Sequence, residues 1–104
     1  EHILMSVEIP LQNGAVNAHQ KFNIQLGDNL LDFEVNYVGS YTGEPGWSMD
    51  ISRDGSKLVS GAMLVPGCDV IANYNAGIGL LIFVGDDPTL DNLGTANHLC
   101  WVAE

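Results

Sequence analysis

The sequence has few basic residues. Three Lys and Arg side chains stand against 13 Asp and Glu, which gives a formal net charge of -10 over 104 residues. The basic residues, Lys21, Arg53 and Lys57, are far apart along the chain. Nucleic-acid binding needs clustered Lys and Arg that release counterions from phosphates, and anionic membranes attract the same clusters. The composition therefore argues against a nucleic-acid partner and against a membrane-surface partner.

Cysteine and long apolar runs are also scarce. Cys68 and Cys100 have no neighbouring Cys that would complete a zinc site or a disulfide framework. We expect free thiols in a reducing compartment, with one disulfide between them as the alternative. No apolar run approaches the roughly 18 residues that span a bilayer, and no secretory leader opens the chain. We expect a soluble, unexported protein with Met5 as its natural start and residues 1–4 as a cloning remnant.

The apolar content is nevertheless high enough for folding. Hydrophobic residues make up 46% of the chain, and a chain of this length buries roughly 65% of its unfolded surface. Twelve glycines and four prolines interrupt the sequence at short intervals. Between them apolar residues recur with a period of two, which is the period of β-strands. The sequence therefore predicts one all-β domain over 1–104, a small antiparallel β-barrel or β-sandwich built from hairpins with little or no helix.

The first half of the chain predicts a hairpin. Residues 19–26 and 30–38 both alternate apolar and polar side chains, which places one face in a core and the other in water. Gly27-Asp28-Asn29 supplies residues that tolerate the positive φ of a tight turn. The side chains expected to point inward are Phe22, Ile24, Leu26, Leu31, Phe33, Val35 and Tyr37.

A second hairpin is predicted after a polar loop over 39–46. Residues 47–52 alternate in the same way, with Trp47, Met49 and Ile51 on one face, and residues 57–64 return beside them. We expect residues 53–56 to form a type I turn with Gly55 in the left-handed region. Gly61 within the returning strand predicts a bulge or bend.

The remaining segments are less regular. Residues 65–69 contain Pro and Gly and are expected to break the sheet, and residues 70–74 fit either one turn of 3₁₀-helix or a short strand. Residues 79–84 are apolar at every position after the glycine, which predicts a central strand buried on both faces. A loop follows over 85–94, and residues 98–103 predict the last strand.

The densest polar cluster carries Asp86, Asp87, Asp91 and Asn92, and Asp69 lies in a separate loop that could fold near it. Several carboxylates invite the idea of a calcium site, but the spacing lacks the glycine and the terminal Glu of an EF-hand loop. Asp and Asn in such loops more often accept backbone N–H bonds in turns. We therefore expect turn scaffolding and no metal or cofactor.

Nucleophilic chemistry is poorly supported. Cys68 or Cys100 would have to act with His98 or His19, and neither cysteine lies at a helix N-terminus that would lower its pKa. Cys100, flanked by Leu and Trp, is interpreted as a small core residue. Gly77-Ile78-Gly79 precedes a strand and is followed by no Lys, so it is not a phosphate-binding loop. No catalytic residue is predicted.

The aromatic residues divide into two groups. Tyr37 and Trp47 lie at strand spacing and are interpreted as core residues. Tyr41 and Tyr74 lie in loop-like contexts beside Gly and Asn, which favours an interface with another protein, where tyrosine is enriched. We expect these two residues at a protein contact.

Two strings stand out in the second half of the sequence, Val65-Pro66-Gly67-Cys68-Asp69 and Asp86-Asp87-Pro88-Thr89-Leu90-Asp91-Asn92-Leu93-Gly94. Both resemble the phage baseplate plug family. The first half is similar as well, with Ile9-Pro10-Leu11, a strand that ends in Leu26-Gly27, and Trp47-x-Met49-Asp50-Ile51 before Asp54-Gly55. The resemblance covers about residues 9–102. It departs from the family pattern at Asp32, Glu34 and Asn36, where basic residues are common, and this departure concerns the partner surface.

The resemblance implies a structural, non-enzymatic virion protein in the baseplate of a contractile phage tail. Such a protein would lie on the tail axis, contact hub and tail-tube proteins, help close the tail tip, and assemble in the host cytoplasm before joining the particle. Symmetry favours a trimeric or hexameric ring. The residues that it suggests as loop scaffold or interface, with the two tyrosines, are Tyr41, Val65, Pro66, Gly67, Asp69, Tyr74, Asp86, Asp87, Asp91 and Asn92.

Two further hypotheses follow from the same residues. The alternative function is a small ligand-binding β-barrel with a pocket floored by Trp47, Phe83 and Trp101. Under the baseplate interpretation, the net negative charge would keep ejected DNA from binding. That hypothesis requires carboxylates to face the axial channel, and the candidates are Asp32, Glu34, Asp50 and Asp54.

Overall fold

The computed structural model describes residues 6–39 and 45–103, and within them it confirms an all-β, antiparallel architecture. The only helical segment in these ranges is a single 3₁₀ turn. The elements are β1 (Ser6–Ile9), η1 (Ala15–Asn17), β2 (His19–Leu26), β3 (Asn29–Val38), β4 (Gly46–Arg53), β5 (Ser56–Met63), β6 (Cys68–Asp69), β7 (Leu80–Gly85) and β8 (Asn97–Val102).

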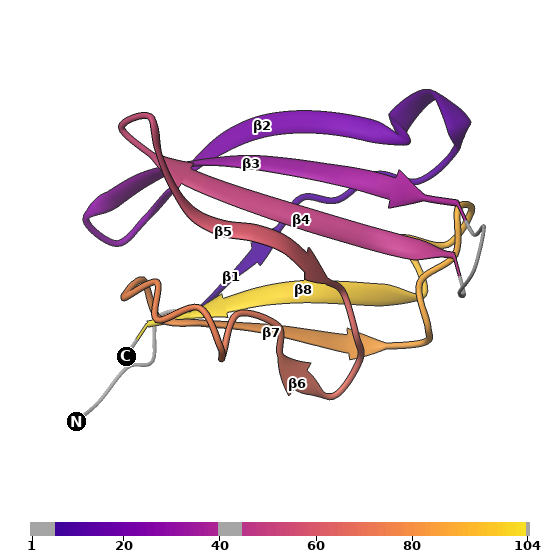
Figure 1. Ribbon diagram of the computed structural model, residues 1–104. Coiled ribbons are helices and arrows are strands. Elements are labelled where there is room, and N and C mark those ends of the chain that lie inside the picture. The colour runs from indigo at the N-terminus through magenta and orange to yellow at the C-terminus, as the bar shows by residue number, and fades with distance from the viewer. Residues whose placement is uncertain (1–5, 40–44, 104) are drawn as a thin grey trace.

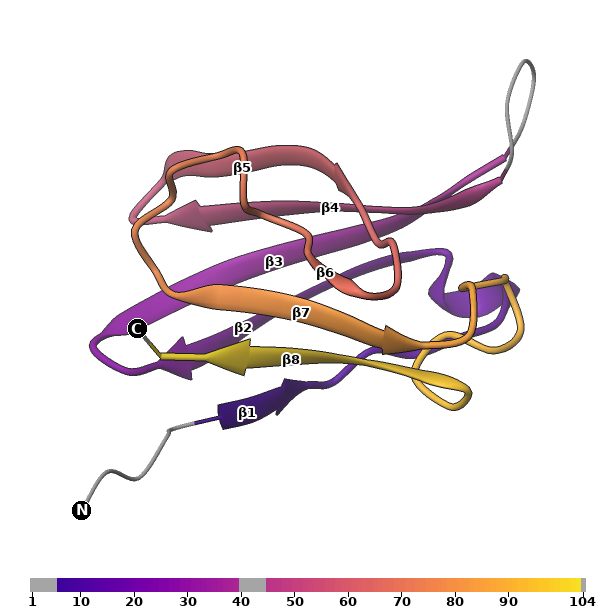
Figure 2. The same cartoon turned by 90° about the horizontal axis from the view of Figure 1, so that it is seen from below.

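The strands form two four-stranded sheets. Sheet A has the order β1-β8-β7-β6 and sheet B has the order β2-β3-β4-β5. Figures 1 and 2 show the two sheets as separate layers that face each other, with the chain crossing between them after β1 and after β5. The pairing of the described strands does not close a barrel.

One apolar core fills the space between the two layers. Sheet B contributes side chains at alternate positions of β3 and β4, and sheet A contributes the inward side of β7 and β8. Complete burial of each large aliphatic or aromatic side chain contributes about 1.5–3 kcal/mol. The buried members from the strands of the two sheets include Leu31, Phe33, Val35, Trp47, Met49, Ile51, Leu81, Phe83, Leu99 and Trp101.

The first hairpin is confirmed with a shorter turn than its sequence suggests. Leu26 pairs with Asn29, so only Gly27 and Asp28 form the loop. Of these, Gly27 alone has a positive φ, of 63°, which is the pattern of a type II′ turn. Phe22 stacks on its cross-strand partner Phe33 with ring centroids 5.3 Å apart.

The second hairpin is confirmed, but its turn is not type I. Arg53 pairs with Ser56, and both intervening residues have positive φ, 53° for Asp54 and 82° for Gly55. This is a type I′ turn, whose twist matches the right-handed twist of the strands it joins. The expectation of a left-handed residue at Gly55 alone was therefore incomplete.

The predicted bulge at Gly61 is confirmed. Opposite the step from Met49 to Ile51, β5 runs from Ala62 to Val59 and so contains one extra residue. Gly61 adopts a φ of 72° there. A second register shift lies between Ile51 and Ser52, and the two irregularities bend β5 at the edge of sheet B.

The predictions for the other segments contain three errors. Residues 65–67 interrupt the sheet as expected, but Cys68 and Asp69 form β6 and pair with β7. Residues 70–74 form successive turns, with Ala72 N–H bonded to Asp69 O and Tyr74 N–H bonded to Ile71 O, and neither a 3₁₀-helix nor a strand.

The third error concerns β7, which is not buried on both faces. Leu81 and Phe83 are fully buried, whereas Leu80 and Ile82 are only half-buried and Val84 is 42% exposed. The strand β1, which pairs with β8, was not predicted because four residues are too few to establish a period.

Gly79→Ala is expected to destabilise the fold more than Gly55→Ala. Both glycines have positive φ, so each alanine costs about 1–2 kcal/mol. A Cβ at Gly79 would also lie 2.6 Å from the Val102 carbonyl oxygen and 2.9 Å from Trp101 Nε1, whereas a Cβ at Gly55 meets nothing within 4 Å. In urea unfolding, Gly79→Ala should therefore lower the free energy of unfolding by about 1–3 kcal/mol more than Gly55→Ala does. Equal losses for the two variants would contradict the steric conflict at Gly79.

Candidate interface

Two of the predicted motifs lie together at one end of the molecule. Val65 and Pro66 from the first motif and Asp87 and Pro88 from the second line a single groove. We call this the motif groove, and its lining residues are Pro45, Gly46, Met63, Leu64, Val65, Pro66, Asp87 and Pro88.

The first motif carries the chain from sheet B to sheet A. Leu64 N–H still bonds to Trp47 O at 3.0 Å, which extends the β4–β5 ladder past the end of β5. Pro66 has no N–H and cannot continue that ladder. Gly67 then adopts a φ of 87° and donates its N–H to Phe83 O at 2.8 Å, so the chain arrives on the edge of β7.

The motif groove presents apolar side chains to solvent. Met63 is 43% exposed and Val65 is 51% exposed. Gly46 makes this position of Met63 possible, because a Cβ on Gly46 would lie 2.9 Å from Met63 Cε. Exposed apolar side chains beside rigid proline-containing loops are typical of protein contacts.

The second motif is organised by two asparagines. Asn92 Oδ1 accepts from Thr89 N–H at 2.7 Å, and its Nδ2 donates to Asp87 O at 3.0 Å. Asn97, which is fully buried, accepts from Gly94 N–H at 2.8 Å and donates to Asp86 O and to Asn92 Oδ1. Four of these five bonds hold a backbone amide or carbonyl of the loop, and the fifth joins the two asparagine side chains, so the loop keeps one shape beside the motif groove.

The acidic residues of the motifs have different environments. Asp69 accepts backbone N–H bonds from Leu81 at 2.9 Å and Ile71 at 3.3 Å, which joins β6 and the following turn to β7. The carboxylates of Asp86, Asp87 and Asp91 make no hydrogen bond within the described part of the chain. Across residues 6–39 and 45–103 no three His, Cys, Asp or Glu side chains come together as metal ligands.

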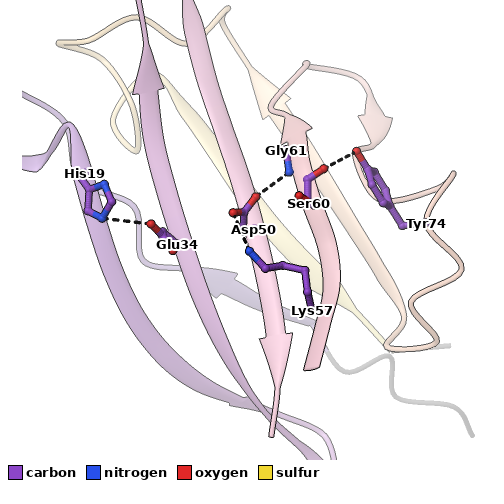
Figure 3. Close-up of polar contacts among 7 residues, drawn as sticks. All are labelled: His19, Glu34, Asp50, Lys57, Ser60, Gly61 and Tyr74. Atoms are coloured by element: carbon purple, nitrogen blue, oxygen red, sulfur yellow. Dashed lines mark hydrogen bonds and ion pairs between the residues drawn. The ribbon is translucent and has the colours of Figure 1, made fainter. Parts of the chain in front are cut away.

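The two predicted interface tyrosines cannot be treated alike. Tyr41 lies outside the described residues. Tyr74 is 36% exposed, and its hydroxyl donates to Ser60 O at 3.3 Å, which ties the segment after β6 to β5 (Figure 3). This bond was not predicted from the sequence, because it depends on where the chain returns after crossing between the sheets.

The outer face of sheet B is polar, and Asp50 is its best-fixed carboxylate. Asp50 Oδ1 accepts from Gly61 N–H at 2.6 Å, and Lys57 Nζ donates to Oδ2 at 3.1 Å (Figure 3). The Gly61 N–H holds the pKa of Asp50 below its ordinary value of 3.8, partial burial opposes this shift, and Lys57 reinforces it. His19 lies 3.2 Å from Glu34 on the same face.

The role of Asp50 was missed in the sequence. The bulge at Gly61 was predicted from glycine alone, but an acid on the neighbouring strand could have been recognised as the group that satisfies the amide released by the bulge.

The cysteines are free thiols separated by β7. Cys68 on β6 is exposed and pairs in register with Phe83, and Cys100 on β8 pairs with Ile82. The interpretation of Cys100 as a core residue was wrong, because it is half-buried on the side of sheet A opposite to Leu99 and Trp101. His98 lies on the same side and bonds to Glu8 Oε2 at 2.5 Å.

The alternative ligand pocket is also contradicted. Trp47 and Phe83 are fully buried and Trp101 is 3% exposed, because all three belong to the core between the sheets. They do not share a pocket: Trp47 and Phe83 are packed core side chains, and Trp101 borders a separate hollow beside Gly27 and Gly79. Tyr37 meets Trp47 edge-on with ring centroids 5.4 Å apart, which agrees with the interpretation of this pair as part of the core.

Comparison with known proteins identifies one family. A family model described as the cyanophage baseplate Pam3 plug gp18 matches residues 6–104. The match spans both motifs and every strand from β1 to β8. No curated protein matches the chain. Within the described ranges, no helix has the length and apolarity needed to cross a membrane.

Asn92→Ala is expected to lower the free energy of unfolding by about 1–3 kcal/mol, because it removes the partners of Thr89 N–H and Asp87 O and one partner of buried Asn97. Asp91→Ala is the matched control, since its side chain is exposed, and a change within about 0.5 kcal/mol is expected. Urea unfolding of both variants makes the comparison. Equal effects would contradict the organising role of Asn92.

Asp50→Asn is expected to destabilise the fold in a pH-dependent way. The pKa of Asp50 is lower in the folded state than in the unfolded state. The ionised carboxylate therefore stabilises the fold fully above the unfolded-state pKa, and this stabilisation is lost as the pH falls through the folded-state pKa. The variant should lose about 1 kcal/mol at neutral pH. The difference in free energy of unfolding between the variant and the native chain should become smaller as the pH falls below 3.8.

The measurement for Asp50 is urea unfolding between neutral and strongly acidic pH. Asp32→Asn is the control, since Asp32 is an exposed carboxylate on the neighbouring strand of the same face. If the difference in free energy of unfolding between Asp50→Asn and the native chain does not change with pH, the carboxylate charge does not stabilise the bulge.

Proposed function

This chain belongs to the cyanophage baseplate plug family and is a structural component of a phage baseplate, and we propose that it closes the tail tip on the axis of the tail tube. It does so through contacts with hub and tail-tube proteins. The family is one of structural proteins and not of enzymes. The virion tail is accordingly its location, and we infer that it folds in the host cytoplasm before it joins the particle.

The motif groove is the observation that supports contact with a partner. Two loops far apart in the sequence meet there, one shaped by Pro66 and Gly67 and the other by the bonds of Asn92. Between them Met63 and Val65 remain exposed. Rigid loops around exposed apolar side chains lower the entropy lost on binding, so we assign this groove to a hub or tube protein.

We infer a trimeric or hexameric ring in the assembled particle, because a component on a symmetric tail axis must follow its symmetry. We also infer that the chain is a single domain with the architecture of a β-sandwich. In support, the two sheets share one core cluster and their described strands do not pair across the layers.

The outer face of sheet B is the face that we assign to the axial channel. Asp32, Glu34 and Asp50 all point outward from this face, and Asp54 lies at the exposed turn between β4 and β5. Their charge repels the phosphates of passing DNA, and Lys21 and Lys57 on the same face offset part of this repulsion. Asp50 also has an intramolecular role at the bulge, so Asp32 and Glu34 are the principal candidates for the repulsion.

Val65→Asp is expected to weaken binding to the hub or tube protein about tenfold or more, because it places a charge in the apolar centre of the motif groove. Val16→Asp is the matched control: Val16 is 93% exposed and lies on η1, outside the groove. Affinities would be measured with purified hub and tube proteins of the same phage. Absence of any complex with the native chain at all salt concentrations would contradict the proposed function.

A further inference from the structure

The outer face of sheet A differs from an ordinary solvent-exposed sheet. Its central side chains on β7 and β8 are apolar, and we call them the sheet A patch: Leu80, Ile82, Val84, Cys100 and Val102. Val84 is 42% exposed and the other four are half-buried. The corresponding central positions on β3 and β4 of sheet B are polar, namely Asp32, Glu34, Asn36, Ser48, Asp50 and Ser52, and the apolar side chains on this side of β3, Leu30 and Val38, lie at the ends of the strand.

An antiparallel sheet with one face in water normally alternates apolar and polar residues. The central parts of β3 and β4 follow this rule, but β7 does not, because Leu80, Ile82 and Val84 point away from the core. A strand that is apolar on both sides is typical of burial on both sides. The composition of β7 thus indicates that a second surface covers the sheet A patch.

The charges around the sheet A patch have one sign. Glu8 lies beside it on β1, Asp69 lies beside it on β6, and Asp86 follows the end of β7. The sequence contains no Lys or Arg before Lys21 or after Lys57, so no strand of sheet A carries either residue. His98 is the basic-type side chain at this face, and it is already bonded to Glu8.

These charges exclude the simplest occupants. A second copy placed patch against patch would bring its carboxylates against those of the first, and like charges at an interface are costly. The outer face of sheet B carries Lys21 and Lys57, but Lys57 is already paired with Asp50. The same face also carries Asp32 and Glu34 and has a polar centre, so it offers neither an apolar centre nor a basic rim. Nucleic acid and anionic lipid are repelled by the same charges.

We propose that the sheet A patch docks a second baseplate protein, whose surface has an apolar centre surrounded by Lys and Arg side chains. This inference rests on the proposed function, and it adds a contact separate from the motif groove. The apolar centre would cover Ile82, Val84 and Val102, and the basic rim would face Glu8, Asp69 and Asp86. The affinity of this contact falls as salt concentration rises, since the rim pairs are screened.

The first test compares Val84→Lys with Asn23→Lys. Each variant adds one positive charge at an exposed position, the first in the sheet A patch and the second on the outer face of sheet B. Each purified hub, tube and other baseplate protein of the same phage is titrated with both variants and with the native chain. For one of these partners, Val84→Lys should weaken binding about tenfold or more, and Asn23→Lys should bind as the native chain does.

A second test does not depend on the stability of Val84→Lys. In Cys68→Ser protein, Cys100 is the single thiol and lies within the sheet A patch. Its reaction with a thiol reagent should slow about tenfold or more when the complex forms, because a covered thiol is inaccessible. A thiol introduced by Asn23→Cys in a chain that also carries Cys68→Ser and Cys100→Ser should react at the same rate free and bound.

The outcomes separate this inference from the proposed function. If a complex forms but Cys100 stays reactive and Val84→Lys binds normally, the patch is not a docking surface and the proposed function stands. If Cys100 reacts more slowly as the concentration of the chain rises without any partner, a second copy covers the sheet A patch and the inference is overturned. If none of the baseplate proteins binds, both fail.

Discussion

Two buried indole N–H groups constrain how the loops lie on the core. Trp47 Nε1 donates to Thr89 O at 2.9 Å, and Trp101 Nε1 donates to Ile78 O at 2.5 Å. A buried N–H without a partner costs about 1–3 kcal/mol, so each tryptophan needs its loop in place. The Thr89 bond fixes the loop after β7 against sheet B, and that loop forms one wall of the motif groove. The position of the candidate interface therefore depends on a bond made inside the core.

Most of the fold was predictable, because alternation with a period of two is a local property of the sequence. Phe33, Met49 and Leu99 could each be placed in the core from their neighbours alone. The type I′ turn was also predictable, because the pair Asp54-Gly55 between two strands favours it over the type I turn that we expected. The short strand β6 was not, since it depends on a pairing partner distant in the sequence. The same limit applies to β1, whose pairing with β8 joins the two ends of the described chain.

The candidate interface was predictable in its parts but not in its assembly. Val65-Pro66-Gly67 and the loop around Asn92 were recognisable as loops, and Asn92 as a residue that satisfies loop amides. Nothing in the sequence indicated that the two loops share one groove, or that Met63 lies in it over Gly46. Those facts arise from the crossing of the chain between the sheets, which brings together residues from both layers.

The prediction that β7 is buried on both faces was wrong for a different reason. Hydrophobic periodicity reports which side chains avoid water, but it does not distinguish a core within one chain from a surface covered by another chain. For β7 the side chains of Leu81 and Phe83 enter the core of this chain, and those of Leu80, Ile82 and Val84 do not. The Lys and Arg residues are confined to sheet B, so the carboxylates around the outward side chains of β7 have no Lys or Arg partner on their own sheet. An apolar strand and a one-sided charge distribution, which were separate features of the sequence, thus meet on one face of the protein.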